Sequence, residues 1–395
     1  MVLPFSNLSD YPEQQYFTDG ITEDLTTDLS RIAGMLVISR NTAFSYQNKR
    51  VDTRQIGREL CVRYVLEGSV RRADKRVRVN AQLIDAETDA HLWAERFDGD
   101  AGDLFSLQDE ITSRIAVALD LELVAAEAAR STKHPDALDY ILQGRAAASN
   151  PRSRGKFAEA IGLFERAFAL DPQSVAAQSW LALTLASRVI NQMTDTTAAD
   201  IARTQILVGQ ALAASPRSAT VHFAKGEVLR AQKRYDEAIP EYERVLAFDR
   251  NSVSALVALG HCKLMSGSIE ELIRLMERAI RLSPRDPQIA VMYYRIGEVH
   301  LLQSRNDEAI SWLEKARSAN IELEYVHAFL ASAYGLKGET ERAAAELAEA
   351  RRRAGDDRYS TIAHLKVGYL GVPKIRALFE ATYLLGLRKA GIPEE

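Results

Sequence analysis

The stretch "VHFAKGEVLRAQKRYDEAIPEYERVLAFD", residues 221–249, recurs along the second half of the chain and decides its fold. A similar stretch, "YYRIGEVHLLQSRNDEAISWLEKARSAN", occupies residues 293–320. Self-similarity at a period of roughly 20 to 50 residues is the sequence signature of a repeat architecture. The period is visible in a column of mostly small residues with successive spacings of 44, 34, 34, 37 and 34: Ala167, Ala211, Val245, Ala279, Ala316 and Ala350.

Two further columns keep step with the first and predict two helices in each unit. Small residues are needed where two helices cross closely, because a larger side chain would push the backbones apart. Large apolar residues then fill the space between helix pairs. The small column is Gly144, Ala182, Gly226, Gly260, Gly297 and Ala331; the large residues are Leu181, Leu259, Ile296 and Leu330 in the first helices, and Phe164, Tyr242, Met276 and Leu313 in the second.

This pattern resembles the tetratricopeptide repeat, a helix-turn-helix unit of about 34 residues. The resemblance predicts an all-α superhelix of about six units over residues 137–355. Residues 126–136 are expected to be a linker. In the closing segment 356–395, Pro373 is placed for a helix start and Gly391 for a helix stop, so capping helices are expected there.

Residues 1–125 lack this period and predict an α+β domain with a mixed sheet. Its central hairpin alternates, with Val77, Val79, Ala81 and Leu83 on one face and Arg76, Arg78, Asn80 and Gln82 on the other. The expected elements are strands at 2–5, 35–39, 63–70, 76–84 and 91–97, and helices at 19–32, 52–60 and 104–120.

The run from "FTDGITEDL" to "AERFDGD", residues 17–100, is similar to the TolB-like N-terminal domain of bacterial signalling proteins. In that family a tetratricopeptide array follows, and a class III adenylate cyclase or winged-helix DNA-binding domain commonly precedes, usually with a membrane span between. The resemblance implies that Val2 to Phe5 match the tail of a first strand and that Met1 lies inside a longer architecture. It also implies possible intramolecular docking with an upstream output domain.

Composition and motifs exclude several functional classes for this chain. The net charge of −4 gives no global positive field, and Cys61 and Cys262 are too far apart in sequence to form a CxxC motif. The GxxxxGK[ST], GxSxG and HExxH motifs are absent, as is GxGxxG after a strand. We therefore expect no catalytic residues, no cofactor, no membrane span and no enzyme activity. The chain as written is expected to be cytoplasmic, or periplasmic within a membrane-anchored parent.

Two charged clusters have both a functional and a structural interpretation. Asp19, Glu23, Asp24 and Asp28 could bind a metal, but Asp19 as an N-cap with acids in the first helical turn explains them better, so no metal site is expected. The run "RRADKRVR" could contact phosphate. Without interleaved aromatic residues it is more typical of an exposed strand, and nucleic acid is not the expected partner. The possible phosphate contacts are Arg71, Arg72, Lys75, Arg76 and Arg78.

A strand containing "HLWAERFD" is expected to place His91, Trp93, Glu95 and Phe97 on one side. A lone histidine beside tryptophan is interpreted as packing. Elsewhere no histidines show the spacing of a metal site.

Helical repeats stack so that their first helices line a concave face. The expected partner is a protein or peptide segment bound there, and the alternative is plain solvated surface. The face lacks the lysine and asparagine set by which some such arrays hold a terminal carboxylate. The expected contacts, mixed in character, are Phe223, Glu227, Arg230, Val257, His261, Leu264, Tyr294, Glu298 and Leu301.

Overall fold

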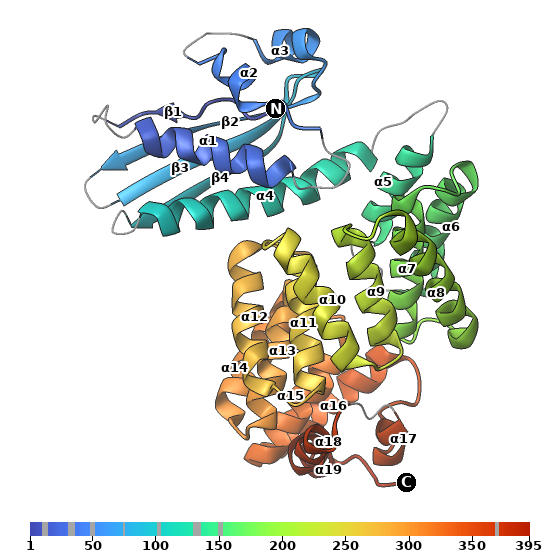
Figure 1. Ribbon diagram of the computed structural model, residues 1–395. Helices are drawn as coiled ribbons and strands as arrows, with labels where there is room; N and C mark the ends of the chain where they lie inside the picture. The colour runs from blue at the N-terminus through green and yellow to red at the C-terminus, as the bar shows by residue number, and fades with distance from the viewer. Residues whose placement is uncertain are drawn as a thin grey trace. The chain divides into compact units, whose positions relative to one another are not determined.

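The computed structural model describes residues 1–9, 15–30, 36–47, 52–73, 76–100, 104–128, 136–148, 153–367 and 371–395. The chain divides into two compact units, Met1–Ala146 and Ala147–Glu395. The first combines a small sheet with helices and the second is helical, as Figure 1 shows. The predicted fold class, an α+β domain followed by an all-α array, is confirmed.

A four-stranded sheet, in the order β1-β2-β3-β4, organises the first unit. The strand β1 (Ser6–Asn7) pairs in parallel with β2 (Tyr64–Ala73), while β3 (Arg76–Asp85) and β4 (Ala90–Asp100) continue the sheet antiparallel. Along β3 exposed and buried positions alternate from Arg76 to Ala81, as the hairpin pattern predicted. One face of the sheet is therefore core and the other polar.

Two helices, α1 (Gln15–Ser30) and α4 (Leu104–Ala128), cover the core face of the sheet (Figure 1). They form one apolar cluster with the sheet, to which the helices contribute the buried residues Phe17, Ile21, Leu25, Leu29, Ile111, Ile115, Ala116 and Leu119. The helix α2 (Arg40–Phe44) is short, and α3 (Thr53–Leu60) buries Ile56 in a second, smaller cluster with Val65.

Three local predictions for this unit are wrong. Residues 36–39 form no strand, because Leu36 is 88% exposed and the run has no buried face; Met35 lies outside the described residues. The helix α1 begins at Gln15, so Asp19 accepts a hydrogen bond from the Gln15 side chain (2.8 Å) inside the helix and caps nothing. The first strand is Ser6–Asn7 with a separate bridge at Val2, since the Phe5 N–H donates to the Thr22 hydroxyl (3.1 Å) and not to β2.

A β-bulge changes the predicted arrangement on β4. The pairing shifts between Leu83, opposite Trp93, and Ile84, opposite His91. The extra residue places His91 and Trp93 on opposite faces of the sheet. The predicted shared side therefore holds for Trp93, Glu95 and Phe97 but is wrong for His91, which is exposed.

The β3–β4 turn depends on one buried carboxylate. Asp85 accepts hydrogen bonds from the backbone N–H groups of Glu87 (2.9 Å) and Thr88 (3.1 Å). It also forms an ion pair with Arg63 (3.1 Å). Burial alone would raise the pKa of the Asp85 carboxyl, but these donors outweigh it and hold that pKa below its ordinary value. A carboxylate with a lowered folded-state pKa stabilises the fold above its unfolded-state pKa, and this contribution disappears as the pH falls through the folded-state pKa.

We therefore expect Asp85→Asn to lower the free energy of unfolding by about 1 kcal/mol at pH 7, because the amide keeps the turn contacts and loses the charge. The difference from the wild type should shrink as the pH falls below about 4. Urea unfolding at several pH values measures this. A difference that stays constant down to the acid limit would contradict it.

The second unit consists of antiparallel helix pairs, and the predicted columns of large residues are buried in it. Small residues allow close crossing within a pair: a Cβ added at Gly226 would lie 2.6 Å from the Tyr242 ring, and one at Gly297 2.7 Å from Leu313. The first helices are α7 (Val175–Ile190), α9 (Ala219–Ala231), α11 (Val253–Met265), α13 (Ile289–Leu302) and α15 (Glu324–Lys337); the second are α6 (Arg154–Leu170), α8 (Thr197–Ala214), α10 (Tyr235–Phe248), α12 (Ile269–Leu282), α14 (Asn306–Ala319) and α16 (Thr340–Ala354).

One further pair member, α5 (Ala137–Ala148), falls largely in the first unit, where Arg145 pairs with Asp120 of α4 at 3.2 Å. The proposed linker at 126–136 and the other domain limits stay predictions.

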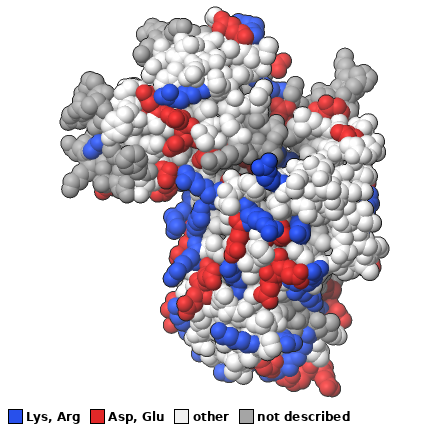
Figure 2. All heavy atoms as spheres, viewed as in Figure 1, with Lys and Arg blue, Asp and Glu red and all other residues white. Residues whose placement is uncertain are grey.

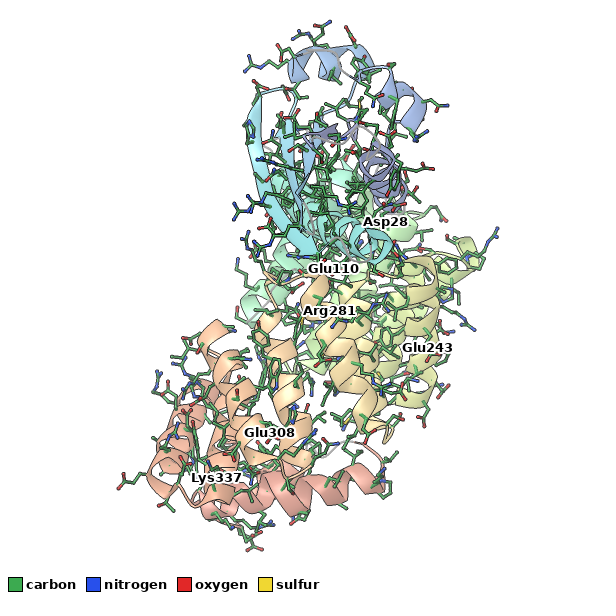
Figure 3. The ribbon with its side chains drawn as sticks, turned by 90° about the vertical axis from the view of Figure 1, so that its left-hand side faces the viewer. Asp28, Glu110, Glu243, Arg281, Glu308 and Lys337 are labelled. Carbon is green, nitrogen blue, oxygen red and sulfur yellow. The ribbon has the colours of Figure 1, made fainter. Side chains whose placement is uncertain are left out.

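The chain closes with α17 (Ile362–Val367) and a helix made of three parts: α18 (Pro373–Phe379), a π-helical turn η2 (Glu380–Leu384) and α19 (Leu385–Lys389). We call residues 373–389 the C-terminal helix. Figure 3 shows it lying crosswise to the repeat helices at the end of the array. It packs against α15, where a Cβ added at Gly335 would lie 2.3 Å from the carbonyl oxygen of Gly386.

Candidate functional site: the concave face

Among the first helices, α7 contacts α9, α9 contacts α11, and α13 contacts α15. We call the surface that the first helices form the concave face, as expected for stacked helical repeats. Charged residues of both signs are interspersed over the part of the array visible in Figure 2. Of the residues predicted to bind a partner, Phe223 of α9 and Val257 of α11 are partly exposed. They offer apolar contact area at the N-terminal half of the face.

Beside Phe223, a buried polar cluster joins α9 and α10. Glu227 accepts hydrogen bonds from Arg230 Nε (3.0 Å) and Nη2 (2.5 Å) and from the Tyr242 hydroxyl (2.6 Å). Burial would lower the pKa of Arg230, but the Glu227 charge outweighs it and raises that pKa, so the guanidinium stays charged. Burial also raises the pKa of Tyr242, which keeps its proton for this hydrogen bond. Glu227 and Tyr242 are buried, so only Arg230 of this internally neutralised cluster is partly exposed.

On α11, His261 is the next predicted contact. Its ring meets the ring of Tyr235 edge-on at 5.8 Å, and its Nδ1 atom is buried without a hydrogen-bond partner in the described structure. Burial, with the nearby charges of Arg295 and Arg230, holds the pKa of His261 well below its ordinary value. His261 itself is buried, so its neutral imidazole offers little surface to a partner in this conformation.

The remaining predicted contacts are buried. Tyr294 of α13 packs against Tyr325 (4.7 Å between ring centroids) and Phe329 (5.1 Å) of α15, and Glu298 accepts from Arg295 (2.7 Å). Leu264 and Leu301 are fully buried. In this conformation these four side chains offer little or no surface to a partner.

The C-terminal helix explains the closure of the C-terminal half of the face. Tyr383 stacks on Phe329 at 4.2 Å, Phe379 meets the same ring edge-on at 6.4 Å, and Tyr294 and Leu301 belong to the same apolar cluster as Tyr383. At the other end, the Val372 N–H donates to the carbonyl oxygen of Met265, the last residue of α11 (2.9 Å). The chain therefore covers part of its own concave face.

Sequence reasoning missed this cover, although a signal was present. Ile375, Phe379, Tyr383 and Leu387 follow one another at four-residue steps. In a regular α-helix such a stripe drifts around the axis, since one turn takes 3.6 residues. The π turn at Glu380–Leu384 is wider and counteracts the drift, so an apolar stripe of this length can face a single surface.

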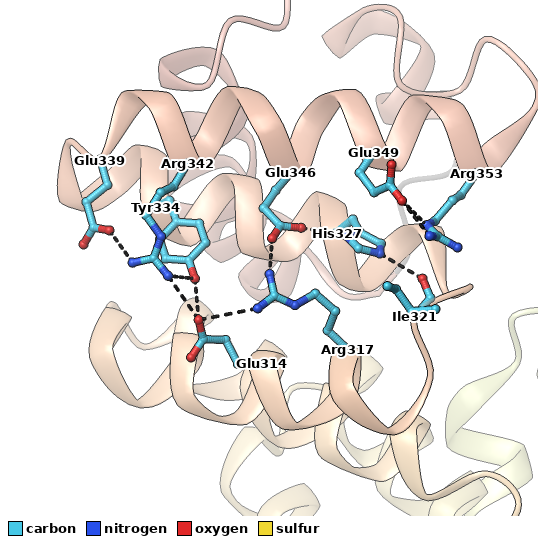
Figure 4. Close-up of polar contacts among 10 residues, drawn as sticks. All are labelled: Glu314, Arg317, Ile321, His327, Tyr334, Glu339, Arg342, Glu346, Glu349 and Arg353. Carbon is cyan, nitrogen blue, oxygen red and sulfur yellow. Dashed lines mark hydrogen bonds and ion pairs between the residues drawn. The ribbon is translucent and has the colours of Figure 1, made fainter.

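A histidine clamp closes two of the loops between helix pairs. His222 lies between the Glu241 carboxylate (Nδ1 to Oε2, 2.6 Å) and the carbonyl oxygen of Pro216 (3.0 Å from Nε2). In Figure 4 the same arrangement joins His327, Glu346 (2.6 Å) and Ile321 (2.9 Å). These buried histidines hold repeat junctions together and do not face a ligand.

The basic hairpin is partly neutralised. Arg71 and Arg78 are cross-strand neighbours on the polar face of the sheet, and Arg78 makes hydrogen bonds to Asp98 at 2.6 and 3.3 Å. Arg76 lies on the same face two residues away, whereas Arg72 points to the other face, opposite Val77. Lys75 lies outside the described residues. Phosphate contact by this hairpin stays a prediction.

Within the described ranges, no cluster of three or more histidine, cysteine, aspartate or glutamate residues is arranged to hold a metal ion. In the acidic stretch of α1, Asp24 accepts a hydrogen bond from Gln108 of α4 (2.6 Å). No described helix has the length and apolar character to cross a membrane.

Family models match both units. Residues 1–114 match the second domain of HilA/YgeH-like transcriptional regulators. Tetratricopeptide models match residues 145–189 and 200–253, 229–296, and 290–320, so the predicted tetratricopeptide repeats are confirmed. The TolB-like character of the first unit stays a prediction.

A curated relative, putative adenylate cyclase 3 of Rhizobium meliloti (strain 1021), is 41% identical over 241 residues, or 60% of this chain. The chain spans 41% of that relative's length. Among solved structures, Cut9 with Hcn1 has a TM-score of 0.49 at 16% identity, over 67% of this chain and 48% of that one. The human IFIT1 dimer with m7Gppp-AAAA has a TM-score of 0.48 at 14% sequence identity, over 72% of this chain and 72% of that one.

Proposed function

We propose that this chain is a non-catalytic scaffold module that binds a protein segment through the N-terminal half of its concave face. One observation carries the proposal: Phe223 and Val257 remain partly exposed on adjacent first helices, beside a polar cluster whose charges are already paired. Exposed apolar side chains next to fixed polar groups are the usual composition of a binding surface. The tetratricopeptide repeats support this role, because stacked repeats create extended concave surfaces.

A photo-crosslinking amino acid at position 257 tests this proposal in the host cell, with the same amino acid at Ile206 as the control. Ile206, on the second helix α8, is 63% exposed, so it reports chance encounters. We expect position 257 to capture one discrete protein that position 206 does not. Phe223→Ala should then weaken binding of that purified protein by roughly tenfold or more, as for an aromatic interface anchor.

Equal capture at both positions would contradict the proposal, and so would capture at position 257 that Phe223→Ala leaves unchanged. Because Phe223 is only partly buried, its removal should leave the far-ultraviolet circular dichroism of the array unaltered. That spectrum separates a lost contact from a lost fold.

A second candidate function is regulation of an adenylate cyclase whose catalytic domain lies elsewhere in a longer polypeptide. The similarity to putative adenylate cyclase 3 favours it, since the alignment covers 241 residues at 41% identity. Reading the gene upstream of the first codon tests this. An in-frame cyclase domain supports it, whereas a stop codon directly upstream with no cyclase in the same transcript contradicts it. Docking of this chain onto such a domain would use the same exposed surface.

A further inference from the structure

The two halves of the C-terminal helix are held very differently. In α19 and the preceding turn, Tyr383, Leu384 and Leu387 are buried, and the Ser332 hydroxyl of α15 donates to the Tyr383 carbonyl oxygen (2.8 Å). In α18, Ile375 is the one fully buried side chain and Phe379 is half-buried. The second half is therefore a firm cap, while the first half is a lightly anchored arm.

The arm is attached near α11 at its start and near α13 and α15 at its end. The turn η2 contacts α13 as well as α15, and the Val372 N–H bonds to the last carbonyl of α11. Gly371, with φ of +94°, turns the chain into the arm at a position where its Cβ would lie 3.1 Å from the same carbonyl oxygen. The start of the arm thus contacts the C-terminal end of α11, the helix that carries Val257 and His261 on its earlier turns.

The π turn between the halves is suited to be the hinge. A π turn interrupts the regular hydrogen-bond ladder of a helix, and such turns concentrate at functional positions. Here the Thr382 hydroxyl donates to the Leu378 carbonyl oxygen (2.7 Å), so a side chain already satisfies a backbone group at the junction. Bending at this point leaves the α19 contacts with α15 intact.

We propose that α18 is a strap between α11 and α13 that opens about the π turn, so that a partner segment bound at α9 and α11 can extend onto α13. This rests on the proposed function, whose site it regulates. Opening exposes Ile375 and the buried part of Phe379, and it breaks the hydrogen bond from the Val372 N–H to the Met265 carbonyl oxygen. The cap stays in place. Binding of a partner would select the open state.

Hydrogen exchange followed by mass spectrometry on the full chain tests the strap without any partner. In the wild type, peptides within 372–379 should exchange faster than peptides within 383–390, because local opening precedes global unfolding. Ile375→Ala should speed exchange of the first group by roughly 30-fold or more and leave the second unchanged. The matched control is Arg376→Ala on the exposed side of α18, which should change neither.

Two results overturn the proposal. One is a common exchange rate for both halves, accelerated equally by Ile375→Ala, which makes the helix a single rigid cap. The other is an Ile375→Ala variant whose 372–379 peptides exchange faster while its crosslink yield at position 257 equals that of the wild type. In that case the strap opens but does not control the site. If neither the wild type nor Ile375→Ala gives a crosslink at position 257, the proposed function is rejected. The exchange rates would still show whether α18 opens independently of α19.

Discussion

Gly335→Ala is expected to lower the free energy of unfolding by about 3 kcal/mol or more, because the added methyl group meets a backbone atom. The new Cβ would lie 2.3 Å from the carbonyl oxygen of Gly386, and a backbone atom cannot rotate out of the way. The facing helix α19 must therefore shift, and Tyr383 and Leu387 lose their packing with it. Urea unfolding followed by circular dichroism measures the loss.

The control is Gly162→Ala in the exposed part of α6, where no atom lies within 4 Å of the added Cβ. Alanine is the better helix former, so this variant should gain about 0.5 kcal/mol or more. Equal effects of the two substitutions would show that the close approach of α15 and α19 does not govern stability. Gly386→Ala should reproduce the loss at position 335, because its Cβ would meet the Ser332 carbonyl oxygen at 2.3 Å.

Arg230→Met should cost about 3 kcal/mol, because it leaves the Glu227 carboxylate buried without its cation. Both groups are largely inaccessible, with side-chain exposures of 17% for Arg230 and 4% for Glu227. The Tyr242 hydroxyl remains as a donor, but a neutral donor cannot replace the guanidinium charge. The free energy of unfolding in urea measures this loss, and the concave face should become less rigid around Phe223.

A double-mutant cycle separates the lost ion pair from lost packing. Adding Glu227→Gln to Arg230→Met removes the orphaned charge and should recover a large part of the stability. Arg234→Met provides the exposed comparison, since Arg234 and Glu237 have the same three-residue spacing but are 47% and 58% exposed. It should cost less than about 1 kcal/mol. Additive effects in the cycle would contradict the interpretation.

The repeat array could be predicted from sequence because its contacts recur at a fixed spacing. Gly226 against Tyr242 and Gly297 against Leu313 are the same contact two repeat units apart, so each column supported the others. The hairpin of the first unit was predictable for a similar reason, since its alternation is local. The run at 36–39 failed because its apolar residues suggest a strand and nothing in the local sequence shows that Leu36 stays exposed.

The candidate site was predicted only in part. The repeat pattern identified the first helices, on which Phe223 and Val257 are partly exposed, and their binding role stays a prediction. It did not show that Tyr294 and Leu301 are covered, because the covering residues lie about eighty positions later in the chain. Contacts between segments so far apart depend on the direction of the C-terminal helix. That direction depends on the backbone conformation of Gly371 and on the π turn, which the composition does not reveal.

The histidine clamp has a consequence for how such an array can change in length. Its three parts, Pro216, His222 and Glu241, recur at Ile321, His327 and Glu346, each displaced by 105 residues. Recombination within the gene could join the segment that precedes one clamp histidine to the segment that follows the other. The new junction would then contain the same three clamp groups at the same spacing. Gain or loss of three helix pairs at once can therefore leave the clamped junction chemically complete.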